Sequence, residues 1–225
     1  MNSKYSNFLT ILLVLIIIAI VGIIGFLGFK YYETHISKNE AEDFVDSFNN
    51  QNTDNNTSVL PKDEVEVEFE GVDETTNTEQ DNTSSGSSQQ KFNNFLVAGT
   101  IEIPATKLSC PILDQSEYSP KALETSVVVI YGTGLNKVGN TTISGHNYRN
   151  GTFFSNNKKL KVGDKIYITD LNGKRLTYTI YDKFEVAENE ADYMVRDTQG
   201  AIEISLSTCT DDSKARLIIL AKADV

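Results

Sequence analysis

The C-terminal part of this sequence, residues 91–225, predicts an all-β fold, either a sandwich or a barrel. Eight short runs rich in β-branched and aromatic residues recur there with turn signals between them. Asn172-Gly173 joins two of these runs and is among the strongest hairpin signals in protein sequences. The length of this part is close to the commonest domain size, so it can hold a core of its own.

Each predicted strand alternates or is continuously apolar over a few residues. The runs are FLVAGTIEI, LSCPIL, SVVVIYG, TTISGH, KIYITDL, RLTYTIYDKFEVA, AIEISLSTC and ARLIILAKA. The two-residue alternation is absent from SPKALET and TFFSNNKKL. We therefore expect one or two short helices at these places.

Near the N-terminus, residues 8–29 read FLTILLVLIIIAIVGIIGFLGF and carry no charge. As a helix this segment extends roughly 33 Å, which is enough to cross a bilayer core. No clean small-x-small cleavage site follows it, so we expect an uncleaved transmembrane signal anchor preceded by a short cytoplasmic segment, residues 1–7. Lys4 lies before the segment while Lys30 and Lys38 follow it, and this count does not set the orientation.

Residues 30–90 are rich in Asn, Thr, Ser and acidic residues, as in NNQNTDNNTSV and KDEVEVEFEGVDETTNTEQDNTSSGSSQQ. Such a composition buries too little apolar surface to offset the entropy of ordering the chain. We expect a flexible acidic and polar stalk. The formal net charge of −11 resides largely here, which argues against a nucleic-acid partner.

The stretch ISLSTCTDDSKAR holds one of the chain's two cysteines, Cys209. Ile202, Ile204 and Leu206 share one face of a strand, so Cys209 lies on the opposite face if the strand stays regular that far. A thiol attacks carbonyls as the thiolate, and a free cysteine with a pKa of about 8.5 is mostly protonated at neutral pH. A nucleophilic role for Cys209 therefore needs a partner that favours the thiolate.

His146 is the candidate for that partner, because the only other histidine, His35, adjoins the apolar segment. His146 ends the run TTISGH, and Gly145 before it permits close approach of another part of the backbone. An imidazolium beside a thiol favours the thiolate and can later donate its proton to a leaving amine.

Arg216 opens the run that follows Cys209 and could return beside the cysteine on the next strand. An arginine is not a base at neutral pH, but its fork of donors suits a substrate carbonyl or a developing oxyanion. The alternative for Arg216 is a surface ion pair with Asp211 or Asp212.

Three segments between about Thr100 and Lys222 resemble the sortases, the cysteine transpeptidases of Gram-positive cell surfaces. GTIEIPATKLSCPIL resembles the opening strand pair of that family, and YGTGLNKVGNTTISGHNYRNGTFFSNNKKLKVGDKIYI resembles its histidine strand and the segment after it. ISLSTCT resembles its Leu-x-Thr-Cys signature, with Arg216 opening the final strand.

This resemblance implies that Cys209 is the nucleophile, His146 the general acid and base, and Arg216 the group that positions and polarises the scissile carbonyl. It implies that Thr208, the threonine of the signature, contacts the substrate. It also implies an eight-stranded closed barrel over residues 91–225 and a catalytic domain outside the cell. No cofactor and no metal are expected.

The reaction implied by the resemblance is cleavage of a surface protein within a Leu-Pro-x-Thr-Gly-like sorting motif (LPXTG) after its threonine. The acyl group would be held as a thioester and passed to an amine of the peptidoglycan precursor or of a pilin. The short segment ENEADYMVRDTQG leaves no room for the long helix of class B sortases, and no Asp-Pro-aromatic lid motif of class C is present. A class A-like or class D-like enzyme is the expectation that remains.

Four acidic residues near this short segment could imitate the calcium site of some class A sortases, but we expect a solvated acidic loop instead. These residues are Glu185, Glu188, Glu190 and Asp192.

The second cysteine, Cys110, lies in KLSCPIL. A disulfide between Cys110 and Cys209 would block the proposed nucleophile, so we predict two free thiols. Cys110 is expected to be a small buried hydrophobic residue.

Two other functions are compatible with the sequence. An L,D-transpeptidase of the cell wall also uses histidine and cysteine, but that family has an arginine two residues after the cysteine, whereas Thr210 and Asp211 follow Cys209 here. A membrane-tethered β-domain without catalysis, such as an adhesin or an assembly scaffold, would use Cys209 and His146 structurally.

Overall fold

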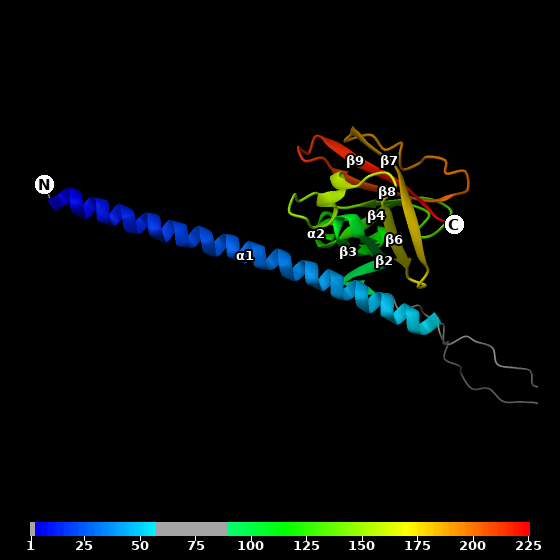
Figure 1. The fold of residues 1–225 in the computed structure, drawn as a ribbon, viewed down its shortest axis with the longest axis horizontal. Helices are drawn as coiled ribbons and strands as arrows, with labels where there is room; N and C mark the ends of the chain where they lie inside the picture. The colour runs from blue at the N-terminus through cyan, green and yellow to red at the C-terminus, as the bar shows by residue number, and fades with distance from the viewer. Residues whose placement is uncertain (1–2, 57–89) are drawn as a thin grey trace, which may run out of the picture. The chain divides into compact units, whose positions relative to one another are not determined.

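The computed structural model describes residues 3–56 and 90–225 (Figure 1). The chain divides into two compact units, residues 1–43 and residues 44–225, which we describe separately. The helices are α1 (Ser3–Asn56), α2 (Pro120–Thr125) and the 3-10 helices η1 (Pro104–Thr106), η2 (Gln115–Glu117) and η3 (Phe154–Lys159). The strands are β1 (Lys91–Phe92), β2 (Phe95–Ile103), β3 (Leu108–Leu113), β4 (Val127–Gly132), β5 (Gly139–Ser144), β6 (Lys165–Asp170), β7 (Arg175–Ala187), β8 (Ile202–Cys209) and β9 (Ala215–Ala223).

Eight of the strands form a closed barrel, as predicted. Their order is β2-β3-β4-β5-β8-β9-β7-β6, and β6 pairs with β2 to close the sheet. The short strand β1 adds to β2 outside this circle. Both predicted short helices are present, as α2 in SPKALET and as η3 in TFFSNNKKL.

The strand pairs β3–β4 and β5–β8 are parallel, and the other pairs are antiparallel. A parallel pair needs a long crossover connection. The chain makes the β5–β8 crossover through η3, β6 and β7, so that segments far apart in the sequence lie side by side (Figure 1). This crossover brings the end of β5 to the end of β8.

The barrel interior is filled by aliphatic side chains that alternate along the strands. Ile101, Ile143, Ile168, Ile204 and Ile219 are each at most 1% exposed. Since alternate residues point to opposite faces, this pattern fixes which face of each strand is turned inward.

The turn predicted at Asn172-Gly173 joins β6 to β7. The Gly173 N–H donates to the Asp170 carbonyl at 3.0 Å, and the Asp170 N–H donates to the Lys174 carbonyl at 3.0 Å. Gly173 has a φ of 74°, a left-handed conformation that glycine adopts without steric cost.

In the first unit, helix α1 contains a segment, Phe8–Phe29, with a mean hydropathy of 3.2 and no buried residue. By length and composition this segment can cross a membrane. Residues 8–29 are therefore helical, as the prediction of a transmembrane anchor requires.

Helix α1 continues to Asn56, whereas the sequence led us to expect a stalk from residue 30. Its last part belongs to the same compact unit as the barrel. Val45 and Phe48 are each 1% exposed, and the Phe44 ring meets the Phe92 ring edge-on at 5.3 Å. One helical face carries these residues, and burying that face stabilises the helix. Residues 57–89 of the expected stalk lie outside the described residues.

A polar contact adds to this apolar one. The Asn49 side-chain amide donates to Glu102 Oε1 at 3.1 Å, and Arg175 Nη1 donates to the same oxygen at 2.5 Å. The hydrogen bond from Arg175 lowers the pKa of Glu102, against the opposing effect of partial burial. Glu102 therefore accepts from both the helix and β7.

Replacing the buried ring with Phe48→Ala should lower the free energy of unfolding of the full chain by about 3 kcal/mol, because the substitution leaves a cavity under the helix. Thermal and denaturant unfolding in detergent micelles, followed by circular dichroism, measures the change. Asp46→Ala, on the exposed side of the same helical turn, is the control and should change it little. Equal effects of the two substitutions would contradict the buried contact.

Candidate active site

Cys209 and Arg216 lie directly opposite each other on β8 and β9. The antiparallel register runs without a shift from Glu203 opposite Lys222 to Cys209 opposite Arg216. The strand is therefore regular to its end, as the expected position of Cys209 requires. The core side of β8 is turned inward through Ile204 and Leu206, and Cys209 is half-buried on the other face.

The Arg216 guanidinium connects the thiol to an acidic residue. Its Nη1 donates to Cys209 Sγ, and its Nη2 donates to Glu188 Oε1 at 2.8 Å. Glu188 directly follows β7 and is exposed. One planar fork thus faces both the sulfur and a carboxylate, a geometry that an ammonium group cannot copy.

The ion pair considered for Arg216 with Asp211 or Asp212 is not formed. Asp211 pairs instead with Lys158, at 2.6 Å, and Asp212 accepts from Thr210 Oγ1 within its own turn at 2.7 Å. The sequence predicts Glu188 only as part of a solvated acidic loop. The sequence contains no local signal that distinguishes it from the other acids of that loop.

His146 lies beyond the end of β5, beside the end of β8. The parallel register keeps a constant offset from Gly139 opposite Ile202 to Ser144 opposite Ser207. Extending the same offset by two residues brings position 146 level with position 209. The half-buried His146 ring packs on the Tyr148 ring, with 4.9 Å between centroids.

Gly145 allows this approach, as the sequence indicated. Its N–H donates to the Ser207 carbonyl at 3.2 Å. A Cβ at this position would lie 2.8 Å from Val127 Cγ1 and 2.9 Å from Phe154 Cδ2. Both distances are too short for carbon atoms, so a side chain here would force the Val127 and Phe154 side chains or the backbone at Gly145 to move.

Thr208 is 3% exposed, and its hydroxyl donates to the Gly145 carbonyl at 2.7 Å. This bond joins β8 to the segment that carries His146. The structure thus gives Thr208 a buried structural contact, and its contact with a substrate stays a prediction.

Asn147 is a site residue that the sequence did not reveal. Its side-chain amide donates to the Cys209 carbonyl at 3.0 Å and to Asp211 Oδ1 at 3.0 Å. Asn147 and Cys209 are 62 residues apart in the sequence. Only its position directly after His146 could have drawn attention to it.

The loop between β7 and β8 covers the outer face of β8. Arg196 donates to Glu203 at 2.7 Å and to Ser205 Oγ at 2.6 Å, and the hydroxyls of Tyr193 and Ser207 lie 3.2 Å apart. These β8 residues occupy alternate positions in the row that ends at Cys209. The loop therefore buries Glu203, Ser205 and Ser207, whereas Cys209, the last residue of β8, stays half-exposed.

Among residues 3–56 and 90–225, no three His, Cys, Asp or Glu side chains gather in a way that could hold a metal ion. In the acidic loop Glu188 contacts Arg216.

The two cysteines are free, as predicted, and lie in different surroundings. Cys110 is 2% exposed, and burial raises the pKa of its thiol to about 12, although hydrogen bonds with Ser126 and the Val127 backbone act in the opposite direction. Burial in an apolar region disfavours the thiolate. Cys110 is thus the small buried residue expected from the sequence.

Taken together, the site has a half-exposed thiol, a guanidinium that donates to the sulfur, and a half-buried histidine two residues beyond the end of the strand that pairs with β8. A thiol in this setting can attack a carbonyl, the guanidinium can stabilise an oxyanion, and the imidazole can transfer protons. This combination supports acyl transfer through a thioester.

Comparison with protein families identifies one that matches the domain containing this site. The family model described as the sortase domain matches residues 101–224, more than half of the chain. Sortase A of Bacillus anthracis is 32% identical over 126 residues, which cover 55% of this chain and 58% of that protein. Sortase A of Streptococcus agalactiae serotype III is 29% identical over 154 residues, which cover 61% of this chain and 57% of that protein. The chain therefore spans somewhat over half the length of these relatives.

Solved structures with a similar fold include sortase A from Corynebacterium diphtheriae, with a TM-score of 0.53 and 28% identity over 59% of this chain and 62% of that one. Sortase D5, a transpeptidase of Clostridium perfringens, has a TM-score of 0.51 and 26% identity over 57% of this chain and 79% of that one. Sortase C1 of Streptococcus agalactiae, solved in complex with MTSET, has a TM-score of 0.51 and 25% identity over 56% of this chain and 69% of that one.

Adding a methyl group with Gly145→Ala should destabilise the protein by about 1–3 kcal/mol, because the new atom overpacks the space against Val127 and Phe154. Denaturant unfolding of the full chain measures the change. If Gly145→Ala is neutral, the close approach at this position is wrong.

The folded protein should present one alkylation site to iodoacetamide between about pH 6 and pH 9, at Cys209. The raised pKa of Cys110 keeps that thiol protonated over this range, and burial excludes the reagent. Peptide mass spectrometry identifies the modified cysteine. Unfolding the protein in guanidinium should expose both thiols, and labelling of Cys110 in the folded protein would refute this prediction.

Proposed function

The chain belongs to the sortase family, and on that premise we propose that it is a membrane-anchored cysteine transpeptidase that cleaves a Leu-Pro-x-Thr-Gly-like sorting motif. The observation that carries this proposal is the half-exposed thiol of Cys209, which accepts a hydrogen bond from Arg216 on the paired strand. A structural cysteine would have no need of that donor.

In the proposed first step the Cys209 sulfur attacks the carbonyl carbon of the motif's threonine. The carbonyl π electrons move to oxygen, where the Arg216 guanidinium donates hydrogen bonds to the developing negative charge. When the tetrahedral intermediate collapses, the C–N bond breaks and His146 donates a proton to the leaving glycine amine. A thioester on Cys209 remains.

In the second step an amine attacks the thioester carbonyl and the C–S bond breaks. His146, now neutral, accepts the proton that the attacking amine loses. The acceptor we propose is an amine of the peptidoglycan precursor or of a pilin. The product is a surface protein joined to that acceptor by a new amide bond.

Glu188 supports the role proposed for Arg216. An arginine side chain has many rotamers, and its ordering costs conformational entropy. The bond to Glu188 Oε1 holds one edge of the fork while the other edge faces the sulfur. The donor is thus oriented before a substrate arrives.

Within the family we propose a class A-like or class D-like enzyme. The segment between β7 and β8 is a short loop without a helix in the part of the chain that the structure describes, unlike the long helix expected of class B. The sequence has no Asp-Pro-aromatic lid motif, which argues against a class C assignment. We also propose that residues 1–7 lie inside the cell and that residues 91–225 lie outside it.

The alternatives from the sequence are less well supported. Cys209 is half-exposed and bonded to a guanidinium, which is not the environment of a core thiol in a scaffold domain. The L,D-transpeptidase reading has no support from the family match.

The test is to incubate the full chain in detergent micelles with a library of Leu-Pro-x-Thr-Gly-like peptides and to look for the acyl-enzyme by mass spectrometry. We expect a mass increase on Cys209 equal to the acyl fragment, and an amide product when an amine acceptor is added. Alkylation of Cys209 by a thiol reagent without acylation by any peptide in the library would contradict the proposal.

Cys209→Ala should abolish cleavage and His146→Ala should nearly abolish it. Arg216→Lys should lower kcat about 100-fold or more, because a single ammonium cannot replace the planar fork at the oxyanion. Peptide cleavage followed by chromatography measures these rates. The melting temperature should change little in all three variants, because none of these side chains is fully buried.

The control for Arg216→Lys is Arg175→Lys, since Arg175 has its own carboxylate partner, Glu102, on other strands of the barrel. It should cleave at nearly the normal rate. Normal cleavage by Arg216→Lys would remove Arg216 from the mechanism.

A further inference from the structure

The position of His146 relative to Cys209 depends on contacts other than a direct bond between them. Within the described residues the structure has no hydrogen bond between the imidazole and the thiol. Strand pairing between β5 and β8 ends at Ser144 and Ser207. The Gly145 N–H still donates to the Ser207 carbonyl at 3.2 Å, and the Thr208 hydroxyl donates to the Gly145 carbonyl at 2.7 Å. His146 is therefore the first residue beyond these bonds to β8, and the chain that follows it is held by other groups.

Two contacts organise the histidine segment internally. Asn147 pairs with Phe153 in an isolated β-bridge, and the Phe154 N–H donates to the His146 carbonyl at 3.1 Å. These contacts shape the segment but do not connect it to the turn after Cys209. The connection to that turn is made by side chains.

Asn147 makes the first connection. Its Nδ2 donates to the carbonyl of Cys209 itself and to Asp211 Oδ1, both at 3.0 Å, while its Oδ1 accepts from the Arg149 N–H at 3.2 Å. Both ends of the amide are therefore bonded. The residue next to the histidine is bonded directly to the residue that carries the thiol.

Asp211 makes the second connection. One carboxylate oxygen accepts from Asn147, and the other accepts from Lys158 Nζ of η3 at 2.6 Å. The hydrogen bond from Lys158, followed by that from Asn147, lowers the pKa of Asp211. Arg149 Nη2 also donates to Ser213 Oγ at 3.0 Å, on the far side of the same turn.

We propose that Asn147, Asp211 and Lys158 form a clamp that positions His146 against Cys209, a role that rests on the proposed function. The three residues join the segment after β5, the turn after β8 and η3. About half of each side chain in the Lys158–Asp211 pair is exposed, and exposed ion pairs add little to stability. The effect of the clamp is therefore on geometry, and small displacements of catalytic groups are costly to rate.

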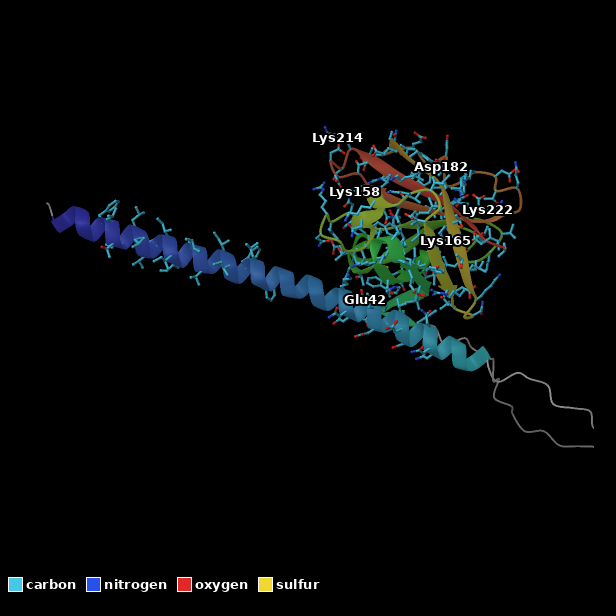
Figure 2. The ribbon with its side chains drawn as sticks, in the orientation of Figure 1. Glu42, Lys158, Lys165, Asp182, Lys214 and Lys222 are labelled. Carbon is cyan, nitrogen blue, oxygen red and sulfur yellow. The ribbon has the colours of Figure 1, made fainter. Side chains whose placement is uncertain are left out.

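The neighbouring residue Asp212 provides a matched control. It is also an exposed acid of the β8–β9 turn, but it accepts from Thr210 Oγ1 at 2.7 Å and from the Lys214 N–H at 3.2 Å, both within the turn. Figure 2 labels Lys158 and Lys214 at the same end of the barrel. Asp211 and Asp212 thus share charge and surroundings, but in the structure only Asp211 reaches the histidine segment.

The experiment compares Asp211→Asn with Asp212→Asn in the full chain in detergent micelles. For Asp211→Asn we expect kcat for peptide cleavage to fall about 10- to 100-fold with KM changed less than about twofold, because the substitution displaces His146 and leaves the remaining surface in place. Asp212→Asn should keep the normal kcat. The melting temperatures of both variants should stay close to that of the unchanged protein.

A second readout needs no substrate. The rate of Cys209 alkylation by iodoacetamide is measured against pH, and the profile of Asp211→Asn should move to higher pH, toward that of His146→Ala. Loss of a negative charge alone would ease thiolate formation and move the profile to lower pH in both variants. If the alkylation profile moves to higher pH only in Asp211→Asn, the cause is therefore that His146 is no longer held in position against Cys209.

The double variant Asp211→Asn/His146→Ala should match His146→Ala in alkylation, because a residue that acts through the histidine has no effect without it. Removing the positive charge of Lys158 would by itself move the alkylation profile to higher pH, so the Lys158 variants are compared in kcat. Lys158→Met should lower kcat as Asp211→Asn does, and Lys158→Arg should keep the normal kcat. These Lys158 variants also carry the test if Asp211→Asn does not fold.

The experiments distinguish failure of the proposed clamp from failure of the proposed function. If the unchanged protein cleaves peptides and Asp211→Asn behaves like Asp212→Asn in rate and alkylation, the clamp is wrong and the proposed function stands. If no peptide is cleaved but the alkylation profile shifts as expected, the clamp stands and the proposed function is wrong.

Discussion

The pairing of β8 with its two neighbours is the constraint on which the site depends. Antiparallel pairing with β9 brings Cys209 opposite Arg216, and parallel pairing with β5 brings the chain before His146 level with the same strand end. A slip of one residue in β8 would turn Cys209 toward the core face and Thr208 outward. The buried Ile204 and Leu206 oppose such a slip, because the same slip would turn them out of the core. The register that builds the core is thus also the register that presents the thiol.

Burial of the outer face of β8 explains why a strand with so many polar residues is stable. Glu203 and Ser205 are covered by the loop after β7, whose Arg196 bonds to both of them. A buried carboxylate without such a partner would be strongly destabilising. The loop does not extend over Cys209, so the thiol at the end of β8 stays partly exposed to solvent. The same loop begins with Glu188, which bonds to Arg216. One segment therefore both shields the strand and orients the guanidinium.

The two free thiols lie in environments that differ in burial and in neighbouring charge. Cys110 lies among core side chains on β3, where the raised pKa keeps it protonated. Cys209 lies at a strand end beside a guanidinium. Membership of the sortase family agrees with this division, and the proposed clamp adds a reason why the histidine need not bond to the thiol in the absence of substrate. Catalytic hydrogen bonds often tighten only when a substrate binds.

Local patterns in the sequence were sufficient for the strands, for the Asn172-Gly173 turn and for the outward face of Cys209, because side-chain alternation and turn preference depend on neighbouring residues. The resemblance of three motifs predicted the family, which the family match confirms, and it also predicted the catalytic residues, whose roles stay a proposal. The Glu188–Arg216 pair and the links of Asn147 to Cys209 and Asp211 join residues 28, 62 and 64 positions apart, and no local pattern encodes them. Nor did the composition of residues 30–90 reveal that Val45 and Phe48 are buried in the unit that contains the barrel. Such contacts are decided by the closed barrel, since only the completed tertiary structure brings these side chains within bonding distance.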